Sequence, residues 1–335
     1  MRRIAPLPLS AAAALLLVAC GSSGGSAASP ANESSASASP SRPVAAPQDV
    51  VAAGAVALTV PGGMDWITTA GDSVWTSNES LVRLDARTGN VLSTLPLDDA
   101  TCLAPDVGFG SLWIGVCSST SQVLRVDPAS GNVTATAALP TGVRLKEESS
   151  IAAGAGAVWA LTTSATIVKI DPMTAEVISS APAPVGGSAV RATEDALWVT
   201  VHDKNALLRL DPATLATVAT IDVGKGPQFL AIGEGAVWTL DQAGGTVTRV
   251  SATTNEVVAT IRVDALYVDG GDIAVGSGFV WARVTDALVA KIDPRNNSVV
   301  DRYGPPGGSG SVAADGSAAW ITAHDSDTVY RLPLS

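Results

Sequence analysis

The chain has few histidine, cysteine and charged residues. Its 335 residues include 2 His and 3 Cys, and charged side chains make up only 15%. Acidic residues outnumber basic ones 31 to 20, which gives a net charge of −11, so a nucleic-acid backbone would repel the chain. No Gly-x-Ser-x-Gly elbow, metal-spaced His/Cys cluster or phosphate-cradling loop is found. We therefore predict no nucleic-acid binding, no metal site and no cofactor.

Aromatic residues are also scarce, but their kinds are unusual. They make up 4% of the chain, and 8 Trp stand against 3 Tyr and 3 Phe. This proportion indicates that Trp occupies one equivalent position in several copies of a repeat. With 47% apolar residues, 32 Gly and 20 Pro, the chain is expected to be globular, rich in strands and interrupted by many turns.

The first 50 residues predict an export signal and a tether. Two Arg precede an apolar stretch over residues 4–19, a pattern typical of a secretory signal peptide over 1–19. The Leu-Val-Ala-Cys sequence at 17–20 resembles the bacterial lipobox, which implies cleavage before Cys20 and lipidation of that residue. A plain secretory signal that leaves a free thiol is the alternative. Residues 20–50 are rich in Ser, Ala and Pro and are expected to form a disordered tether.

This N-terminal region also predicts where the protein resides. A lipidated Cys20 would anchor the chain to the outer face of the bacterial cell membrane, in the extracytoplasmic space. The membrane is then contacted through the lipid anchor, while the folded part, residues 51–335, remains free of it.

One phrase recurs seven times between residues 51 and 335. It consists of an apolar strand, Gly-x-Gly or a variant, a small residue, an aliphatic residue and Trp, as in Gly233–Trp238. Successive copies are 38 to 46 residues apart. The recurring residues are Trp75, Trp113, Trp159, Trp198, Trp238, Trp281 and Trp320. A period near 40 with four short strand signals in each unit predicts a seven-bladed β-propeller.

A second phrase, apolar-x-basic-apolar-Asp, follows about ten residues after each Trp, with degenerate copies in two units. Its aspartates precede turn-forming residues and are interpreted as turn builders. The basic residue occurs in every unit, so we assign it to inter-blade or surface ion pairs. These residues are Arg83, Arg125, Lys169, Arg209, Arg249, Lys291 and Arg331.

The two ends of the repeat predict how the ring closes. The last unit stops before its fourth strand, whereas a strand-like segment at residues 55–60 precedes the first unit. We expect an all-β fold, a single seven-bladed propeller in which the N-terminal strand completes the last blade and hides its edge.

The phrases over 226–238 and 170–174 resemble those of YVTN/YncE-like and streptogramin-lyase-like (virginiamycin B lyase-like) seven-bladed propellers of bacteria. The resemblance implies the fold. The lyase would imply magnesium-assisted ring opening by histidine and glutamate, from a Trp-Phe-Thr-Glu phrase. Here the matching stretches at 198–201 and 320–323 lack the glutamate, so we do not transfer the activity.

Three groups of candidate residues follow from the predicted register. Cys102 and Cys117 lie opposite each other on one hairpin and are expected to form a disulfide, the alternative being two free thiols. Positions at loop ends form a candidate ligand-binding face: Glu79, His202, Asp203, Gln242, His324 and Asp325. Innermost-strand positions predict a lining for the central channel: Trp66, Asp106, Arg191, Phe229 and Asp272.

The two histidines separate the possible functions. They belong to the fourth and seventh units, so we expect them on opposite sides of the ring, each paired with its own neighbour, Asp203 or Asp325. The leading hypothesis is a monomeric, non-catalytic scaffold that binds a protein, a cell-wall fragment or a small molecule. The alternative is a streptogramin-lyase-like lyase or hydrolase using His202 or His324. A quinone-cofactor dehydrogenase is the third and least favoured hypothesis, since no part of the sequence resembles the cofactor contacts of such enzymes.

Overall fold

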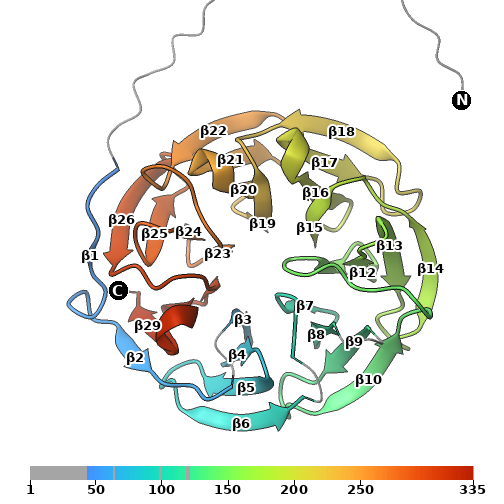
Figure 1. The fold of residues 1–335 in the computed structure, drawn as a ribbon, viewed down its shortest axis with the longest axis horizontal. Coiled ribbons are helices and arrows are strands. Elements are labelled where there is room, and N and C mark those ends of the chain that lie inside the picture. The colour runs from blue at the N-terminus through green and yellow to red at the C-terminus, as the bar shows by residue number, and fades with distance from the viewer. Residues whose placement is uncertain (1–43, 63–64, 98–99, 118–120, 335) are drawn as a thin grey trace, which may run out of the picture. The chain divides into compact units, whose positions relative to one another are not determined.

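The computed structural model describes residues 44–62, 65–97, 100–117 and 121–334, so the predictions for 1–19 and for Cys20 lie outside it. Seven sheets are arranged in a ring (Figure 1), which confirms the all-β, seven-bladed propeller. Each blade is an antiparallel sheet whose first strand is innermost and whose fourth is at the rim. Among the described residues, no helix is long and apolar enough to cross a membrane.

The strands occupy equivalent places in every blade. The innermost are β3 (Trp66–Ala70), β7 (Asp106–Gly108), β11 (Ile151–Gly154), β15 (Gly187–Ala192), β19 (Pro227–Gly233), β23 (Ile273–Gly276) and β27 (Val312–Ala314). The second are β4 (Ser73–Ser77), β8 (Ser111–Val116), β12 (Ala157–Leu161), β16 (Leu197–Val201), β20 (Ala236–Asp241), β24 (Phe279–Arg283) and β28 (Ala318–Ala323). The third are β5 (Ser80–Asp85), β9 (Gln122–Val126), β13 (Thr166–Ile170), β17 (Ala206–Leu210), β21 (Thr246–Ser251), β25 (Val289–Asp293) and β29 (Thr328–Pro333). The rim strands are β6 (Val91–Pro96), β10 (Val133–Ala138), β14 (Val177–Pro182), β18 (Thr217–Asp222), β22 (Val257–Arg262), β26 (Ser298–Gly304) and β2 (Val56–Leu58).

The repeated glycines build the turn between the first two strands. In the third blade the two central turn residues, Ala155 and Gly156, have φ values of 50° and 76°, as a type I′ hairpin requires. A Cβ on the preceding Gly154 would lie 2.8 Å from the Cβ of Ala192 in the next blade. We call the side of the ring that carries these turns the hairpin face, and the opposite side the loop face.

The seven repeated Trp fill the seams between blades. Each is at most 1% exposed, and the indole N–H of Trp159, for example, donates to the carbonyl of Gly154 at 2.9 Å. A basic side chain from the third strand of the same blade lies over each ring, from 4.9 Å at Lys169 to 6.0 Å at Arg125. Such cation–π contacts explain why a cation is repeated in every unit.

The ion pairs that we assigned to these cations are present for two of the seven, and several of the inter-blade contacts are made to backbone carbonyls instead. Several of them donate to a backbone carbonyl in the turn between the third and fourth strands of the next blade. Arg125 reaches Met173 at 2.9 Å, for example. Of the seven, Arg209 and Lys291 have an acidic partner among the described residues, at 2.6 Å and 3.9 Å. A backbone carbonyl can replace a carboxylate as the partner, because it accepts a hydrogen bond from the guanidinium and no second charge has to be desolvated.

The recurring aspartates build turns, as predicted. In the fourth blade, Asp211 Oδ1 accepts the backbone N–H groups of Ala213 at 3.0 Å and Thr214 at 2.7 Å. The Thr214 hydroxyl and these N–H groups hold the pKa of Asp211 below its usual value, because hydrogen bonds to the charged form favour it.

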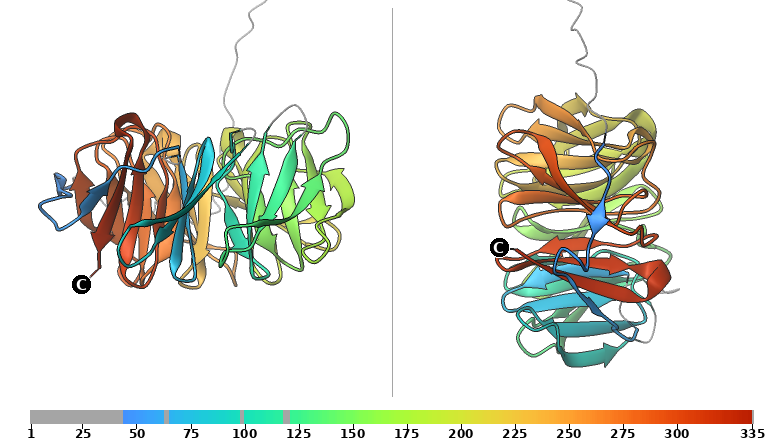
Figure 2. Two further views of the ribbon diagram at one scale, coloured as in Figure 1. Left: turned by 90° about the horizontal axis from the view of Figure 1, so that it is seen from below. Right: turned by 90° about the vertical axis from the view of Figure 1, so that its left-hand side faces the viewer.

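The N-terminal segment closes the ring in two places, beside β29 and β26 (Figures 1 and 2). Strand β2 pairs with β29 in antiparallel fashion and completes the last blade, as expected. Before it, β1 (Gln48–Asp49) adds a fifth, parallel strand to β26 of the sixth blade. Val50, between the two strands, is fully buried. The sheet pairing therefore starts three residues before residue 51, where we placed the start of the folded part.

Candidate functional site

The two cysteines of the second blade are joined. Cys102 and Cys117 form a disulfide with Cα atoms 5.6 Å apart, as predicted. They are not direct ladder partners, however, because β7 covers only Asp106–Gly108 and the pairing before it shifts, so that Thr101 faces Val116. Leu103 is fully buried next to this shift. The disulfide therefore holds in place the irregular segment that precedes β7.

The two histidines begin short 3₁₀ turns on the loop face. His202 starts η1 (His202–Lys204) and His324 starts η3 (His324–Ser326). The expected local pairing is present: His202 Nδ1 lies 2.9 Å from Asp203, and His324 Nδ1 lies 3.6 Å from Asp325. Within the described part of the chain, no three His, Cys, Asp or Glu side chains are arranged to hold a metal ion.

The other loop-face candidates contact their own surroundings. Glu79 is exposed. Gln242 starts η2 (Gln242–Gly244); its side-chain amide donates to the carbonyl of Gly270, and its own carbonyl accepts the N–H of Val268 at 2.8 Å. Gln242 therefore supports a neighbouring loop. No hydrogen bond or ion pair among the described residues joins the candidates of different blades.

The channel candidates divide into two sets. Asp106, Arg191 and Asp272 line a central cavity of about 370 Å³, together with innermost-strand residues of all seven blades. Trp66 and Phe229, from blades one and five, do not line it. Their rings are 6.4 Å apart, and they pack in one cluster with Ala104 of blade two and Ala231 of blade five. The aromatic pair therefore fills the channel instead of lining it.

The charges in the cavity are incompletely balanced. Burial raises the pKa of Asp106 and of Asp272, although Arg191 opposes both shifts. Asp106 Oδ2 accepts the N–H of Ala153 at 2.8 Å, and Asp272 accepts the hydroxyl of Ser311. Buried carboxylates cost free energy unless hydrogen bonds or cations compensate them, and here Arg191, these hydrogen bonds and the buried Arg283 near Asp272 compensate part of that cost.

Two features of the loop face are absent from our sequence predictions. The first is Glu148, where burial, Asp65 and Asp272 raise the pKa to about 7 and φ is 79°. The sequence does mark this region, because the second and third Trp are 46 residues apart, the longest distance in the repeat, and the additional residues include Glu148.

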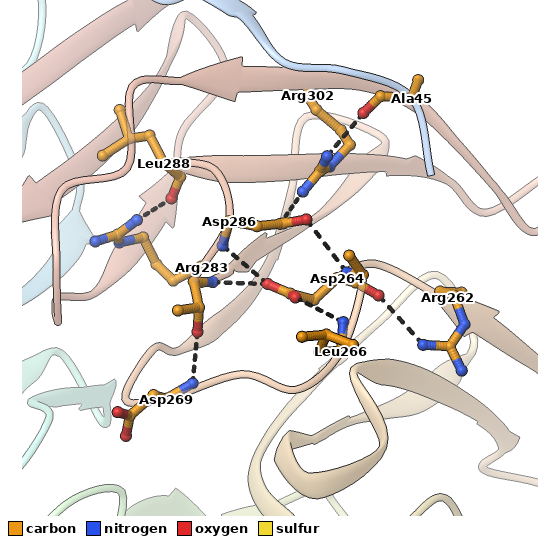
Figure 3. Close-up of polar contacts among 11 residues, drawn as sticks. Ala45, Arg262, Asp264, Leu266, Asp269, Arg283, Asp286, Leu288 and Arg302 are labelled. Carbon is orange, nitrogen blue, oxygen red and sulfur yellow. Dashed lines mark hydrogen bonds and ion pairs between the residues drawn. The ribbon is translucent and has the colours of Figure 1, made fainter. Parts of the chain in front are cut away.

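The second is the connection from β22 to β23, residues 263–272, which we call the braced loop (Figure 3). Asp264 is 2% exposed and accepts the N–H groups of Thr285 at 2.9 Å and Asp286 at 3.0 Å. Asp286 in turn accepts the N–H of Ala265 at 3.2 Å and pairs with Arg302. Burial and the nearby Asp264 raise the pKa of Asp286. The sequence marks this longer connection by the 43-residue distance from Trp238 to Trp281.

Comparisons with known proteins agree on the fold. A streptogramin B lyase structure matches with a TM-score of 0.67 and 18% identity, over 83% of this chain and 97% of that one. BamB from Moraxella catarrhalis matches with a TM-score of 0.53 and 15% identity, over 79% and 81%. A chain of the mitotic checkpoint complex matches with a TM-score of 0.67 and 13% identity, over 87% and 97%.

No family model matches the chain, and no curated protein matches it. At these identities the structural likeness shows the fold alone. The protein is thus a seven-bladed propeller of the streptogramin-lyase-like architecture, and its function has to be argued from its own side chains.

Proposed function

We propose that this protein is a non-catalytic, protein-binding scaffold, tethered to the outer face of the bacterial membrane, which recognises its partner with the loop face. The observation that carries the proposal is the braced loop, because it holds two large apolar side chains in solvent. Leu266 is 75% exposed and Tyr267 is 52% exposed. Exposed apolar side chains on a supported backbone are typical of recognition sites.

The polar contacts explain why this loop is a rigid surface. Asp264 accepts the N–H of Leu266 itself at 3.2 Å, Thr285 accepts the N–H of Asp269 at 2.6 Å, and Gln242 accepts that of Val268 at 2.8 Å. Arg302 connects the network to the N-terminal segment by donating to the carbonyl of Ala45 at 2.7 Å. A loop fixed at this many points loses little conformational entropy when it binds.

The surroundings indicate the chemistry of the partner. Asp269 is exposed beside Leu266 and Tyr267, and the whole chain is acidic, with a net charge of −11. A complementary protein would present an apolar pocket flanked by basic side chains. BamB and the mitotic checkpoint complex, which share the fold, support a role in protein binding by analogy only.

Capture of the partner tests the proposal. The mature domain, residues 21–335, is immobilised and exposed to extract from the cells that make it, and bound proteins are identified by mass spectrometry. We expect one protein that is retained by the wild type and lost with Leu266→Ser/Tyr267→Ser. The matched control is Met173→Ser, because Met173 is 72% exposed and lies in a hairpin-face turn. Equal retention by both variants would overturn the proposal.

The tether is tested separately. Metabolic labelling with a fatty acid should mark the full-length chain, and Cys20→Ser should abolish the label and release the protein from the membrane fraction. A labelled Cys20→Ser chain would contradict the lipobox interpretation.

The alternative, a lyase or hydrolase, has a direct assay. The fold resembles that of streptogramin B lyase, so the purified protein is incubated with a streptogramin B and magnesium while ring opening is followed by chromatography. Turnover that His202→Ala or His324→Ala abolishes would replace the scaffold hypothesis with the enzyme hypothesis.

A further inference from the structure

The central cavity is a concave surface that meets the braced loop at Asp272, the last residue of that loop. Its lining comes from the innermost strand of every blade, and its volume of about 370 Å³ is in the range of small-molecule sites. Most lining residues are small or aliphatic. The charged ones among the described residues are Asp106, Arg191 and Asp272.

The aromatic pair determines from which side the cavity is open. Trp66 and Phe229 contact each other across the channel, and both are at least nine-tenths buried. The lining residues of the same two strands, 67–69 and 231–232, follow them in sequence. Innermost strands run from the loop face to the hairpin face, so the cavity lies on the hairpin side of the aromatic floor. A ligand would therefore enter from the hairpin face.

The guanidinium of Arg191 does not complete the charge balance. Its Nη1 donates to the carbonyls of Ile151 at 3.0 Å and Val190 at 2.9 Å, and its Nη2 donates to the hydroxyl of Ser149 at 3.2 Å. Among the described residues it forms no ion pair with Asp106 or Asp272. Arg191, the cation of the lining, is thus bound to the channel wall. Outside the lining, the buried Arg283 also interacts with Asp272, while the carboxyl group of Glu148 places a further negative charge near Asp272.

A buried donor on the floor also lacks a partner. The Nε1 of Trp66 has no hydrogen-bond acceptor among the described residues, although the ring lies within the channel against Phe229. Buried N–H groups are rarely left unpaired, and such a group indicates a bound water or ligand. This donor is independent of the carboxyl groups and lies on the aromatic floor, outside the lining of the cavity.

We propose that the central cavity binds a small organic molecule that carries a primary ammonium group, held by Asp106 and Asp272 and admitted from the hairpin face. The ammonium supplies the missing positive charge and donates charge-assisted hydrogen bonds to the two carboxylates. Its arrival lowers the pKa of both groups, which burial raises in the unliganded protein.

Calorimetric titration with tyramine tests this site. The neutral analogue 4-ethylphenol is the ligand control, because it has hydrogen in place of the ammonium group. We expect saturable binding of tyramine at one site, no measurable binding of 4-ethylphenol, and a dissociation constant at least tenfold higher in Asp106→Asn and in Asp272→Asn. Asp241→Asn is the matched control, since Asp241 is a buried carboxyl outside the lining, and should leave the constant unchanged.

Three results would overturn the proposal: no binding of tyramine at any soluble concentration, equal binding of 4-ethylphenol, or unchanged binding in both Asn variants. If one variant does not fold, the other decides. Leu266→Ser/Tyr267→Ser should bind tyramine like the wild type, so that failure of this site and failure of the protein-binding proposal are distinguishable.

Discussion

Arg331, in the last strand of the chain, donates from Nε to the backbone carbonyl of Ala86 in the first blade at 3.2 Å, across a separation of 245 residues. The same guanidinium lies 5.7 Å from the ring centroid of Trp320 in its own blade. One side chain therefore links the seventh blade to the first through the same contact that links the second to the third. The ring is therefore closed by the same arginine–carbonyl hydrogen bond that links other neighbouring blades, in addition to the pairing of the N-terminal strand.

Arg331→Ala should lower the free energy of unfolding by about 1–3 kcal/mol, because it removes a cation–π contact and a hydrogen bond. Arg125→Ala is the control, since Arg125 makes the equivalent contacts with Trp113 and Met173 inside the ring. Urea denaturation should show similar losses for both. A loss at Arg331 alone would mean that the closing seam is a weak point, and no loss at either would contradict the energetic role of the repeated cation.

The N-terminal segment should be essential to stability. Val50→Ala removes two methyl groups from a fully buried site between β1 and β2 and should cost about 1–2 kcal/mol. Deletion of residues 51–60 should lower the unfolding midpoint much further, because it exposes the edge of β29. Deletion of residues 21–43 is the control and should leave the midpoint unchanged. Equal midpoints in all three variants would contradict the closure by β2.

The repeat explains why the fold could be predicted. The Trp phrase and the turn aspartates recur at a nearly constant period, and each copy independently indicates the same four strands. Pairing of β1 with β26 could not be predicted, because Gln48 and Asp49 carry no apolar alternation. Their position depends on the buried Val50 and on a backbone edge that only the folded ring creates.

The site could be predicted less well, for a related reason. Alternation along the innermost strands placed Asp106, Arg191 and Asp272 in the channel lining. It could not show that Trp66 and Phe229, 163 residues apart in the sequence, fill the channel between blades one and five. The braced loop depends on contacts between two different connections, in which Asp264 and Asp286 hold each other's backbone, and no repeated pattern marks them.

The disulfide should contribute measurably to stability. Cys102 and Cys117 are separated by 15 residues, and cross-linking a loop of this length restricts the unfolded chain by about 3 kcal/mol. Cys102→Ala/Cys117→Ala should lower the free energy of unfolding by about 2–4 kcal/mol. Mass spectrometry under denaturing conditions should show a gain of two hydrogens when the wild type is reduced. An unchanged mass would show that the thiols are free.

Asp241 should make stability fall as pH rises through the mildly acidic range. It is fully buried and accepts hydroxyl groups from Thr239 at 2.6 Å, Thr246 at 3.0 Å and Thr248 at 2.6 Å. Burial outweighs these hydrogen bonds and raises the pKa of Asp241 to about 6, against about 3.9 in an unfolded chain. Between these values the folded state keeps a proton that the unfolded state has lost, so its stability decreases with rising pH.

This contribution should be complete below about pH 4 and lost above about pH 6, with a size of about 3 kcal/mol for a shift of about two pKa units. Asp241→Asn removes the titration but keeps groups that can bond to the threonine hydroxyls. Unfolding free energies measured from pH 4 to 7 should therefore fall less steeply in Asp241→Asn than in the wild type. Asp211→Asn is the control, because the pKa of Asp211 is held below its usual value, so that Asp211 titrates below the pH range of this measurement. Identical slopes in the wild type and Asp241→Asn would mean that Asp241 is ionised throughout, and that the three threonines compensate its burial in full.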